Sequence, residues 1–163
     1  MINLVRQDYV PYRQFALVFI SLSFVGCSGP SGTRQLAEAY FETYAERDNW
    51  EDMLGYYSDS VMFTDVTLKL DLEGKQAFAG FYNWPDDRFE KGNPHGPTLV
   101  VESLVTEGLT AVARGYFAPF YWDGVLMGAE PWEFTIWLEY NEAGLITRQI
   151  DMLRYPKAFL PED

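Results

Sequence analysis

The stretch AYFETYAERDNWEDMLGYYSDSVMFTDV, residues 39–66, contains a change in hydrophobic period that sets the order of the first elements. Leu36, Tyr40 and Tyr44 recur every four residues, which predicts a helix with Thr33 as its N-cap and an end near Arg47. Asn49 can cap a second short helix, WEDMLGYY, whose first turn carries acids. From residue 61 the period changes to two, which predicts a strand.

This predicted strand, VMFTDV (residues 61–66), carries an acid in unusual surroundings. Asp65 shares one face with Val61 and Phe63, and the opposite face is also largely apolar. We therefore expect Asp65 to point into a poorly hydrated place, where an unpaired carboxylate is costly or keeps its proton. Its predicted role is that of an acid in a pocket.

The remainder of the chain alternates in the manner of a sheet. We expect LKLDL (residues 68–72) to pair with the first strand, a third helix over KQAFAGFYNW (residues 75–84), and a polar loop at residues 85–97. Longer strands are predicted at 98–105, 109–122 and 132–140, and the turn NEAG leads into a last strand at 145–155. Helices followed by a run of strands predict an α+β fold with a curved antiparallel sheet wrapped around helices.

Composition narrows the choice of partners. Of the 163 residues, 48% are hydrophobic and 17% aromatic, which favours a globular domain with enough aromatic rings to line an apolar pocket. The formal net charge is −12 and no run of lysine or arginine offsets it. Nucleic acid and anionic membrane surfaces are therefore not expected as electrostatic partners.

The first thirty residues differ from the rest of the chain. FALVFISLSFV (residues 15–25) has the size of a signal-peptide core and is too short for an ordinary membrane span. FVGC, ending at Cys27, resembles a bacterial lipobox, in which the cysteine is lipidated and becomes the new N-terminus. This predicts a signal peptide at 1–26, a tether at 27–32 and one domain at 33–163. A plain signal peptide or a short anchor is the alternative.

The lipoprotein resemblance also implies a place in the cell. Ser28 after the cysteine favours sorting to the outer membrane of a bacterial envelope, so the expected chain is a periplasm-facing lipoprotein that touches the membrane through its lipid alone.

Few residue types are available for chemistry. His95 is the only histidine and Cys27 the only cysteine, and there is no phosphate-binding glycine loop, so neither a metal nor a cofactor is expected. Catalysis would rest on carboxylates, tyrosines and arginines. On the predicted strand 109–122, Arg114 shares its face with apolar neighbours and requires a partner, for which Asp65 and Asp151 are the candidates.

The layout of residues 39–66, the helix led by Gly74 and the segment NEAGLITRQID resembles a SnoaL-like member of the nuclear transport factor two-like superfamily. The resemblance runs from about Ala37 to Tyr155. It implies a cone, also called a cystatin-like roll, in which a strongly bent sheet and N-terminal helices enclose an apolar pocket. It also implies a homodimer.

The same resemblance suggests roles for particular residues. In ketosteroid isomerases of the superfamily, a helix tyrosine and a strand aspartate match Tyr40 and Asp65, whereas the second aspartate falls near Ile136. In limonene-epoxide hydrolases an Asp–Arg–Asp set matches Asp151 and Arg114, with Tyr116 in place of the third member. Polyketide cyclases also use an aspartate at the position of Asp151.

The sequence therefore predicts Asp65 and Asp151 as base and acid, Arg114 as the group that orients a carboxylate, and Tyr40 as a hydrogen-bond donor. The expected substrate-binding residues are Tyr44, Phe63, Tyr116, Trp132 and Phe134. The aspartates could equally serve only to stabilise the cone, and the two helix tyrosines could serve only as core. Three functions stay open: a cofactor-independent isomerase, cyclase or hydrolase, a non-catalytic domain for a small hydrophobic ligand, and a protein-interaction domain.

Overall fold

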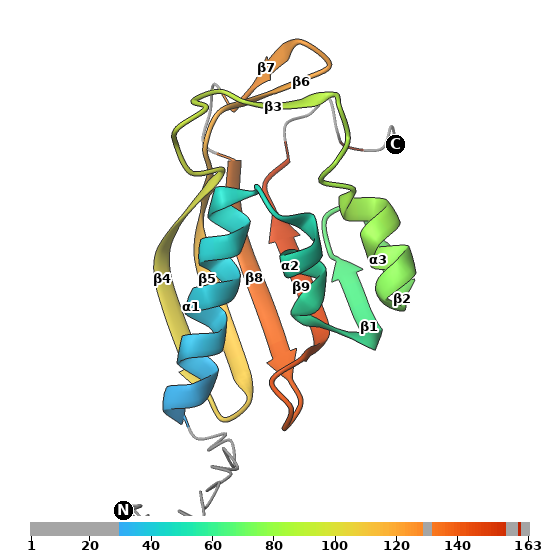
Figure 1. The fold of residues 1–163 in the computed structure, drawn as a ribbon, viewed down its shortest axis with the longest axis vertical. Helices are drawn as coiled ribbons and strands as arrows, with labels where there is room; N and C mark the ends of the chain where they lie inside the picture. The colour runs from blue at the N-terminus through green and yellow to red at the C-terminus, as the bar shows by residue number, and fades with distance from the viewer. Residues whose placement is uncertain (1–29, 129–131, 156–159, 161–163) are drawn as a thin grey trace, which may run out of the picture.

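The computed structural model describes residues 30–128, 132–155 and Leu160, and it has the predicted α+β fold with a large curved sheet (Figure 1). In chain order the elements are α1 (Pro30–Glu46), α2 (Trp50–Gly55), β1 (Tyr57–Asp65), β2 (Leu70–Glu73), α3 (Lys75–Tyr82), β3 (Phe89–Lys91), β4 (Leu99–Glu107), β5 (Thr110–Phe117), β6 (Phe120–Trp122), β7 (Val125–Met127), β8 (Trp132–Tyr140) and β9 (Ile146–Leu153).

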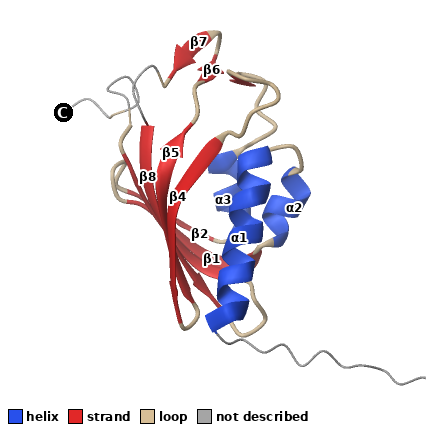
Figure 2. Cartoon of the chain, turned by 90° about the vertical axis from the view of Figure 1, so that its left-hand side faces the viewer, coloured by secondary structure: helices blue, strands red, loops and turns tan. Residues whose placement is uncertain are grey.

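The main sheet has six strands in the order β2-β1-β9-β8-β5-β4. All neighbours are antiparallel except β1 and β9, which run parallel and join the first described strand to the last. The sheet bends, and all three helices lie on its concave side (Figure 2). The concave side is therefore where a pocket between sheet and helices can form.

Strict alternation produces the two faces of the sheet. In β8, WEFTIWLEY, every second residue is buried, from Trp132 at 8% exposure through Ile136 at 0% to Tyr140 at 5%. The helix stripe meets this face, because Tyr40 and Tyr44 of α1 are 0% and 5% exposed. Each fully buried aromatic side chain contributes about 1.5–3 kcal/mol, so this aromatic core accounts for much of the driving force of folding.

Gly115 permits a close approach of two strands within the main sheet. A Cβ built at this position would overlap the carbonyl oxygen of Val100 on β4 and would lie 3.0 Å from the ring of Phe134. Because Gly115 has no side chain, the backbone of β5 can lie close to both the backbone of β4 and the ring of Phe134. Any larger residue here must push the backbone of β4 away.

The predicted strand 109–122 is wrong as one continuous element. It breaks into β5 and β6 at Ala118 and Pro119, since proline has no N–H for the ladder. The expected loop at 85–97 also contains a strand, β3, and the sequence pattern does not predict β7. Together β3, β6 and β7 form a second, three-stranded sheet, which lies beyond the upper end of the helices in Figure 1.

Most other boundaries move by a few residues. The helix α1 begins at Pro30, so residues 30–32 are helical rather than part of a tether, and Thr33 is not the N-cap. Instead the hydroxyl of Thr33 is buried and donates to the carbonyl of Gly108 at 2.8 Å. The predicted cap of the second helix is confirmed, because the side chain of Asn49 accepts from the backbone N–H of Asp52 at 3.2 Å.

The predicted signal segment and Cys27 lie outside the described residues, so lipidation stays a prediction. Within 30–128 and 132–155, the helices are all too short or too polar to cross a membrane.

Candidate active site

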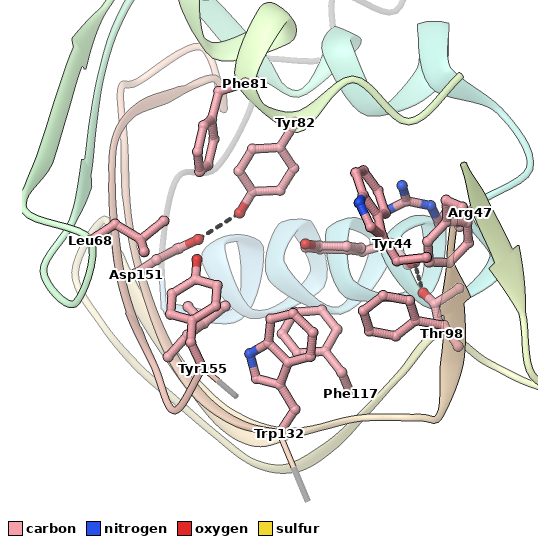
Figure 3. Close-up of a pocket in the computed structure, with 14 residues that line it drawn as sticks. Tyr44, Arg47, Leu68, Phe81, Tyr82, Thr98, Phe117, Trp132, Asp151 and Tyr155 are labelled. Atoms are coloured by element: carbon pink, nitrogen blue, oxygen red, sulfur yellow. Dashed lines mark hydrogen bonds between the residues drawn. The ribbon is translucent and has the colours of Figure 1, made fainter. Parts of the chain in front are cut away.

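A cavity of about 270 Å³ lies between the concave face of the sheet, α3 and the second sheet (Figure 3). Its wall is mostly aromatic and aliphatic, and the polar groups are few. The residues that line it are Tyr44, Arg47, Leu68, Phe81, Tyr82, Phe89, Thr98, Phe117, Phe120, Trp122, Trp132, Asp151, Leu153 and Tyr155. An apolar wall with a small number of polar groups is typical of a site for a small organic molecule.

Asp151 is the carboxylate in this wall. It is 2% exposed, and its Oδ2 accepts from the hydroxyl of Tyr82 at 2.6 Å while its Oδ1 accepts from Nε2 of Gln149 at 2.8 Å. Burial raises the pKa of Asp151 to about 7, although both hydrogen bonds act in the opposite direction, and the nearby charge of Asp65 adds to the rise. Near neutral pH this carboxyl group can therefore either accept or give a proton.

Gln149 holds Asp151 in place. It lies two residues before Asp151 on β9 and is 0% exposed. Its amide oxygen accepts hydrogen bonds and its amide nitrogen donates them. Its Oε1 accepts from Tyr57 at 2.6 Å and from Tyr40 at 3.2 Å, and its Nε2 donates to Tyr82 at 2.8 Å besides Asp151. Because every polar atom of the amide is used, Gln149 fixes the orientation of the acid.

Asp65 is buried as predicted, and it is the register partner of Asp151 on the neighbouring parallel strand. Its carboxylate does not line the cavity, however. Oδ1 accepts from the backbone N–H of Leu68 at 2.8 Å, and Oδ2 accepts from the hydroxyl of Tyr155 at 2.5 Å. Asp65 thus stabilises a turn and a tyrosine that do line the cavity, and its role as a base stays a prediction.

The expectation that Arg114 orients one of these aspartates is wrong. In β5 the inward residues are Ala111, Ala113, Gly115 and Phe117, so Arg114 lies on the convex face. Its side chain is 68% exposed and pairs there with Glu102 at 3.4 Å. Alternation along the sequence correctly placed Arg114 and Tyr116 on one face of the strand. The opposite face, which carries the small residues, is the one that packs against α1.

Tyr116 was predicted to contact the substrate. It lies on the outward face with Arg114 and is 36% exposed, so it does not reach the cavity. Phe63 and Phe134 are buried but stand behind the wall: Phe63 packs on Phe78 and Tyr82, and Phe134 packs between Phe41 and Phe117. Tyr40 is likewise enclosed, and it contacts the site through its hydrogen bond to Gln149 and through the ring of Tyr44.

Tyr44 and Trp132 line the cavity, and their role in binding a substrate stays a prediction. The hydroxyl of Tyr44 points toward the middle of the cavity in Figure 3. Burial, followed by the charge of Asp151, raises the pKa of Tyr44, so the phenol remains protonated and can donate a hydrogen bond.

Sequence reasoning missed Tyr82, Gln149 and Arg47 as site residues. Gln149 could have been found from its spacing, because it shares a strand face with Asp151. Tyr82 comes from the last turn of α3, and only the packing of that helix against β1 and β2 brings it over β9. Arg47 follows the end of α1, where no periodic pattern assigns it a direction.

The described part of the chain contains no group of three or more His, Cys, Asp or Glu side chains placed to hold a metal ion. The two buried aspartates share their surroundings with tyrosine hydroxyls and an amide, which suit proton transfer better than metal ligation.

Comparisons with known proteins agree on the fold. No protein-family model matches the chain, and no curated protein is significantly similar to it. Among solved structures, one similar protein is described as a SnoaL-like polyketide cyclase of Shewanella denitrificans, with a TM-score of 0.61, 18% identity, and coverage of 76% of this chain and 90% of that one.

Two other solved structures superpose comparably. An LEH-like epoxide hydrolase of M. tuberculosis has a TM-score of 0.60 at 12% identity, covering 77% of this chain and 84% of that one. A protein described as a ketosteroid isomerase of Kribbella flavida has a TM-score of 0.55 at 23% identity, covering 80% and 82%. The chain therefore has the SnoaL-like, nuclear transport factor two-like fold, which these proteins combine with different chemistries.

Proposed function

We propose that the protein is a cofactor-independent acid/base enzyme in which Asp151 moves a proton on a small hydrophobic carbonyl compound. The observation that carries this proposal is a buried carboxyl group with a pKa of about 7 in the wall of an apolar cavity. A general base is most effective when its pKa lies near the working pH, and burial is the usual means of raising an aspartate to that range.

The reaction would begin with Asp151 ionised. One of its oxygens takes a proton from the carbon next to the carbonyl group, and the electron pair of that C–H bond forms a C=C bond while the carbonyl oxygen becomes an enolate. The hydroxyl of Tyr44 donates a hydrogen bond to this oxygen, which stabilises the charge as it develops. Asp151, now protonated, returns the proton to another carbon in an isomerisation, or to a new alkoxide after ring closure.

Tyr82 and Gln149 would keep the base ready for this step. Both donate to Asp151 and so hold its oxygens in one orientation while they lower a pKa that burial raises. Epoxide hydrolysis is less well supported, since Arg114, the predicted partner of the acid, lies on the other face of the sheet.

Deuterium exchange tests this proposal on simple compounds that need not be the natural substrate. Small aromatic ketones and β-dicarbonyl compounds are incubated with the protein in deuterated buffer near pH 7, and loss of the C–H signal is followed by NMR. The wild type should accelerate exchange in at least one compound, and Asp151→Asn should lower that rate about 10²–10⁴-fold. The matched control is Asp71→Asn, which alters an exposed carboxylate bonded to Thr64.

If compounds bind to the cavity but none exchanges, the non-catalytic binding domain is the correct function. If exchange occurs and survives Asp151→Asn unchanged, the assignment of the base is wrong.

A second proposal concerns the convex face of the sheet, which favours self-association. Met62, Val105, Trp137 and Met152 expose 45%, 63%, 38% and 42% of their surface there. We propose that two copies pair through this face. Light scattering of the purified wild-type chain should give the mass of a dimer, and Trp137→Lys should give the mass of a monomer. A wild-type chain that stays monomeric at high concentration would refute the proposed pairing.

We also retain the bacterial envelope as the proposed location, on the sequence from Phe15 to Cys27 alone. Growth with labelled palmitate should label the wild-type chain and leave Cys27→Ser unlabelled.

A further inference from the structure

Arg47 contributes a cation to the same cavity. It follows the last residue of α1, and its φ of 48° turns the chain at the helix end. Its guanidinium carbon lies 3.8 Å from the ring centroid of Phe89 and 5.2 Å from that of Trp84. The guanidinium therefore lies within cation–π distance of two rings, which limits its movement and gives it a defined place in the wall.

The charge of Arg47 is not neutralised by the described residues. Its Nε is buried without a hydrogen-bond partner, and no described carboxylate lies within 4.0 Å of its guanidinium. The charge of Asp86 acts on it from a greater distance, but the carboxylate of Asp86 already accepts from Arg88 at both oxygens, at 2.8 and 2.5 Å. Arg34, Arg114 and Arg154 differ from it in that each has a carboxylate within 4.0 Å.

A partly desolvated cation without a counter-ion is unfavourable in an apolar wall. Desolvation lowers the pKa of Arg47, although not enough to remove a guanidinium charge near neutral pH. Such a group is stabilised when a ligand brings an anion to it, and a planar carboxylate matches the guanidinium in shape.

The two ionisable groups of opposite charge in the cavity wall, Asp151 and Arg47, lie on different sides of it. Figure 3 shows Asp151 with Tyr82 on one side of the cavity and Arg47 on the other, with the ring of Tyr44 between them. Aromatic and aliphatic side chains, including Phe117 and Trp132, fill the wall between the two ends. A bound molecule would thus meet an acid/base group at one end, a cation at the other, and an apolar surface along its length.

We propose that the cavity binds a flat hydrophobic carboxylate, with its anionic group on Arg47 and its reacting carbon beside Asp151. This inference rests on the proposed function for the reacting end only. The anion also selects the direction of binding, because an ionised Asp151 repels a carboxylate while Arg47 attracts it. The substrate class is therefore an aromatic or polyene keto acid rather than a neutral ketone.

Calorimetric titration of the purified full-length chain with 2-naphthoic acid and 2-naphthamide tests the anion site by itself. The two probes have the same ring system and nearly the same size but differ in charge. The titrations use the Asp151→Asn background, so that neither turnover nor ionisation of the acid affects the result. The acid should bind about tenfold or more tightly than the amide, because a charge-assisted pair replaces a neutral contact.

Arg47→Met should remove this preference and leave the affinity for the amide within about threefold. Arg47→Lys keeps the charge and should retain part of the preference, which separates loss of charge from loss of folding. Arg114→Met is the matched control, because it removes an arginine on the convex face, and it should leave the preference unchanged.

Equal affinity for acid and amide in the Asp151→Asn protein overturns the anion site, and so does a preference that survives Arg47→Met. Either result leaves deuterium exchange on neutral ketones, and with it the proposed function, untouched. Absence of binding by both probes also overturns the proposed carboxylate site, and deuterium exchange then decides the proposed function by itself.

Discussion

Replacing Asp151 by asparagine should stabilise the protein, and the gain should grow with pH. In the folded chain the pKa of Asp151 is about 7, against an ordinary value of 3.8. The folded state therefore binds more protons than the unfolded state between these values, so this carboxyl group makes the fold less stable as pH rises from about 4 to about 7. Asparagine has no charge to bury and removes this dependence.

The size of the effect follows from the two pKa values. At about 1.36 kcal/mol for each pH unit, ionised Asp151 costs the fold roughly 4 kcal/mol at pH 8 and between about 1 and 2 kcal/mol at pH 5. The difference in free energy of unfolding between Asp151→Asn and wild type should therefore become about 2–3 kcal/mol more favourable between pH 5 and pH 8. Asp151→Asn also loses the hydrogen bond from Gln149. This loss lowers the stability of the variant by the same amount at pH 5 and at pH 8, so it leaves the change of the stability difference with pH unaltered.

Urea unfolding followed by circular dichroism at pH 5, 6, 7 and 8 measures this slope. The control is Asp86→Asn, because the hydrogen bonds from Arg88 hold the pKa of Asp86 well below its ordinary value, so this group stays ionised over the whole range. The difference in free energy of unfolding between Asp86→Asn and wild type should therefore not change with pH. A flat difference for Asp151→Asn as well would show that the acid is not buried as described, and the mechanism would lose its base.

Three further changes test the surroundings of the site. Tyr82→Phe removes a donor to Asp151 and should raise its pKa, seen as an upward shift in the carbon-13 carboxyl titration; no shift would show that the bond is absent. Gln149→Leu leaves buried tyrosine hydroxyls without their acceptor and should lower the free energy of unfolding by about 2–4 kcal/mol, whereas Gln76→Leu on an exposed helix face should change it little. Gly115→Ala should cost several kcal/mol or prevent folding through the overlap with β4, while the exposed helix change Gly80→Ala should stabilise by about 0.5–1 kcal/mol.

The fold was predictable because its signals are local. Period-four spacing identified α1, the cap at Asn49 identified α2, and alternation identified β8 nearly to the residue. The break at Pro119 could also have been foreseen, since a proline seldom continues a central strand. What the local pattern does not contain is the parallel pairing of β1 with β9, which depends on how the sheet closes around the helices.

The site was predictable only in part, for a related reason. Asp65 was found because an acid on an apolar strand face is anomalous wherever the strand lies, and Asp151 because its segment resembles one with an aspartate at that position in related enzymes. Alternation groups the residues of a strand into two faces but does not say which face is concave, and this is why Arg114 and Tyr116 were assigned to the wrong side. Tyr82 and Arg47 come from helix ends, whose direction is decided by packing.

The parallel pair of β1 and β9 also fixes when the site can form during synthesis. Asp65 and Asp151 are register partners on neighbouring strands that lie far apart in the sequence, and the tyrosine that binds Asp65 comes four residues after Asp151. Contacts of such long sequence separation form late in folding, because a long loop must close first. A chain still emerging from the ribosome can build its helices and hairpins, but the proposed site is incomplete until the last strand is released. The proposed activity would therefore require synthesis to have passed Tyr155.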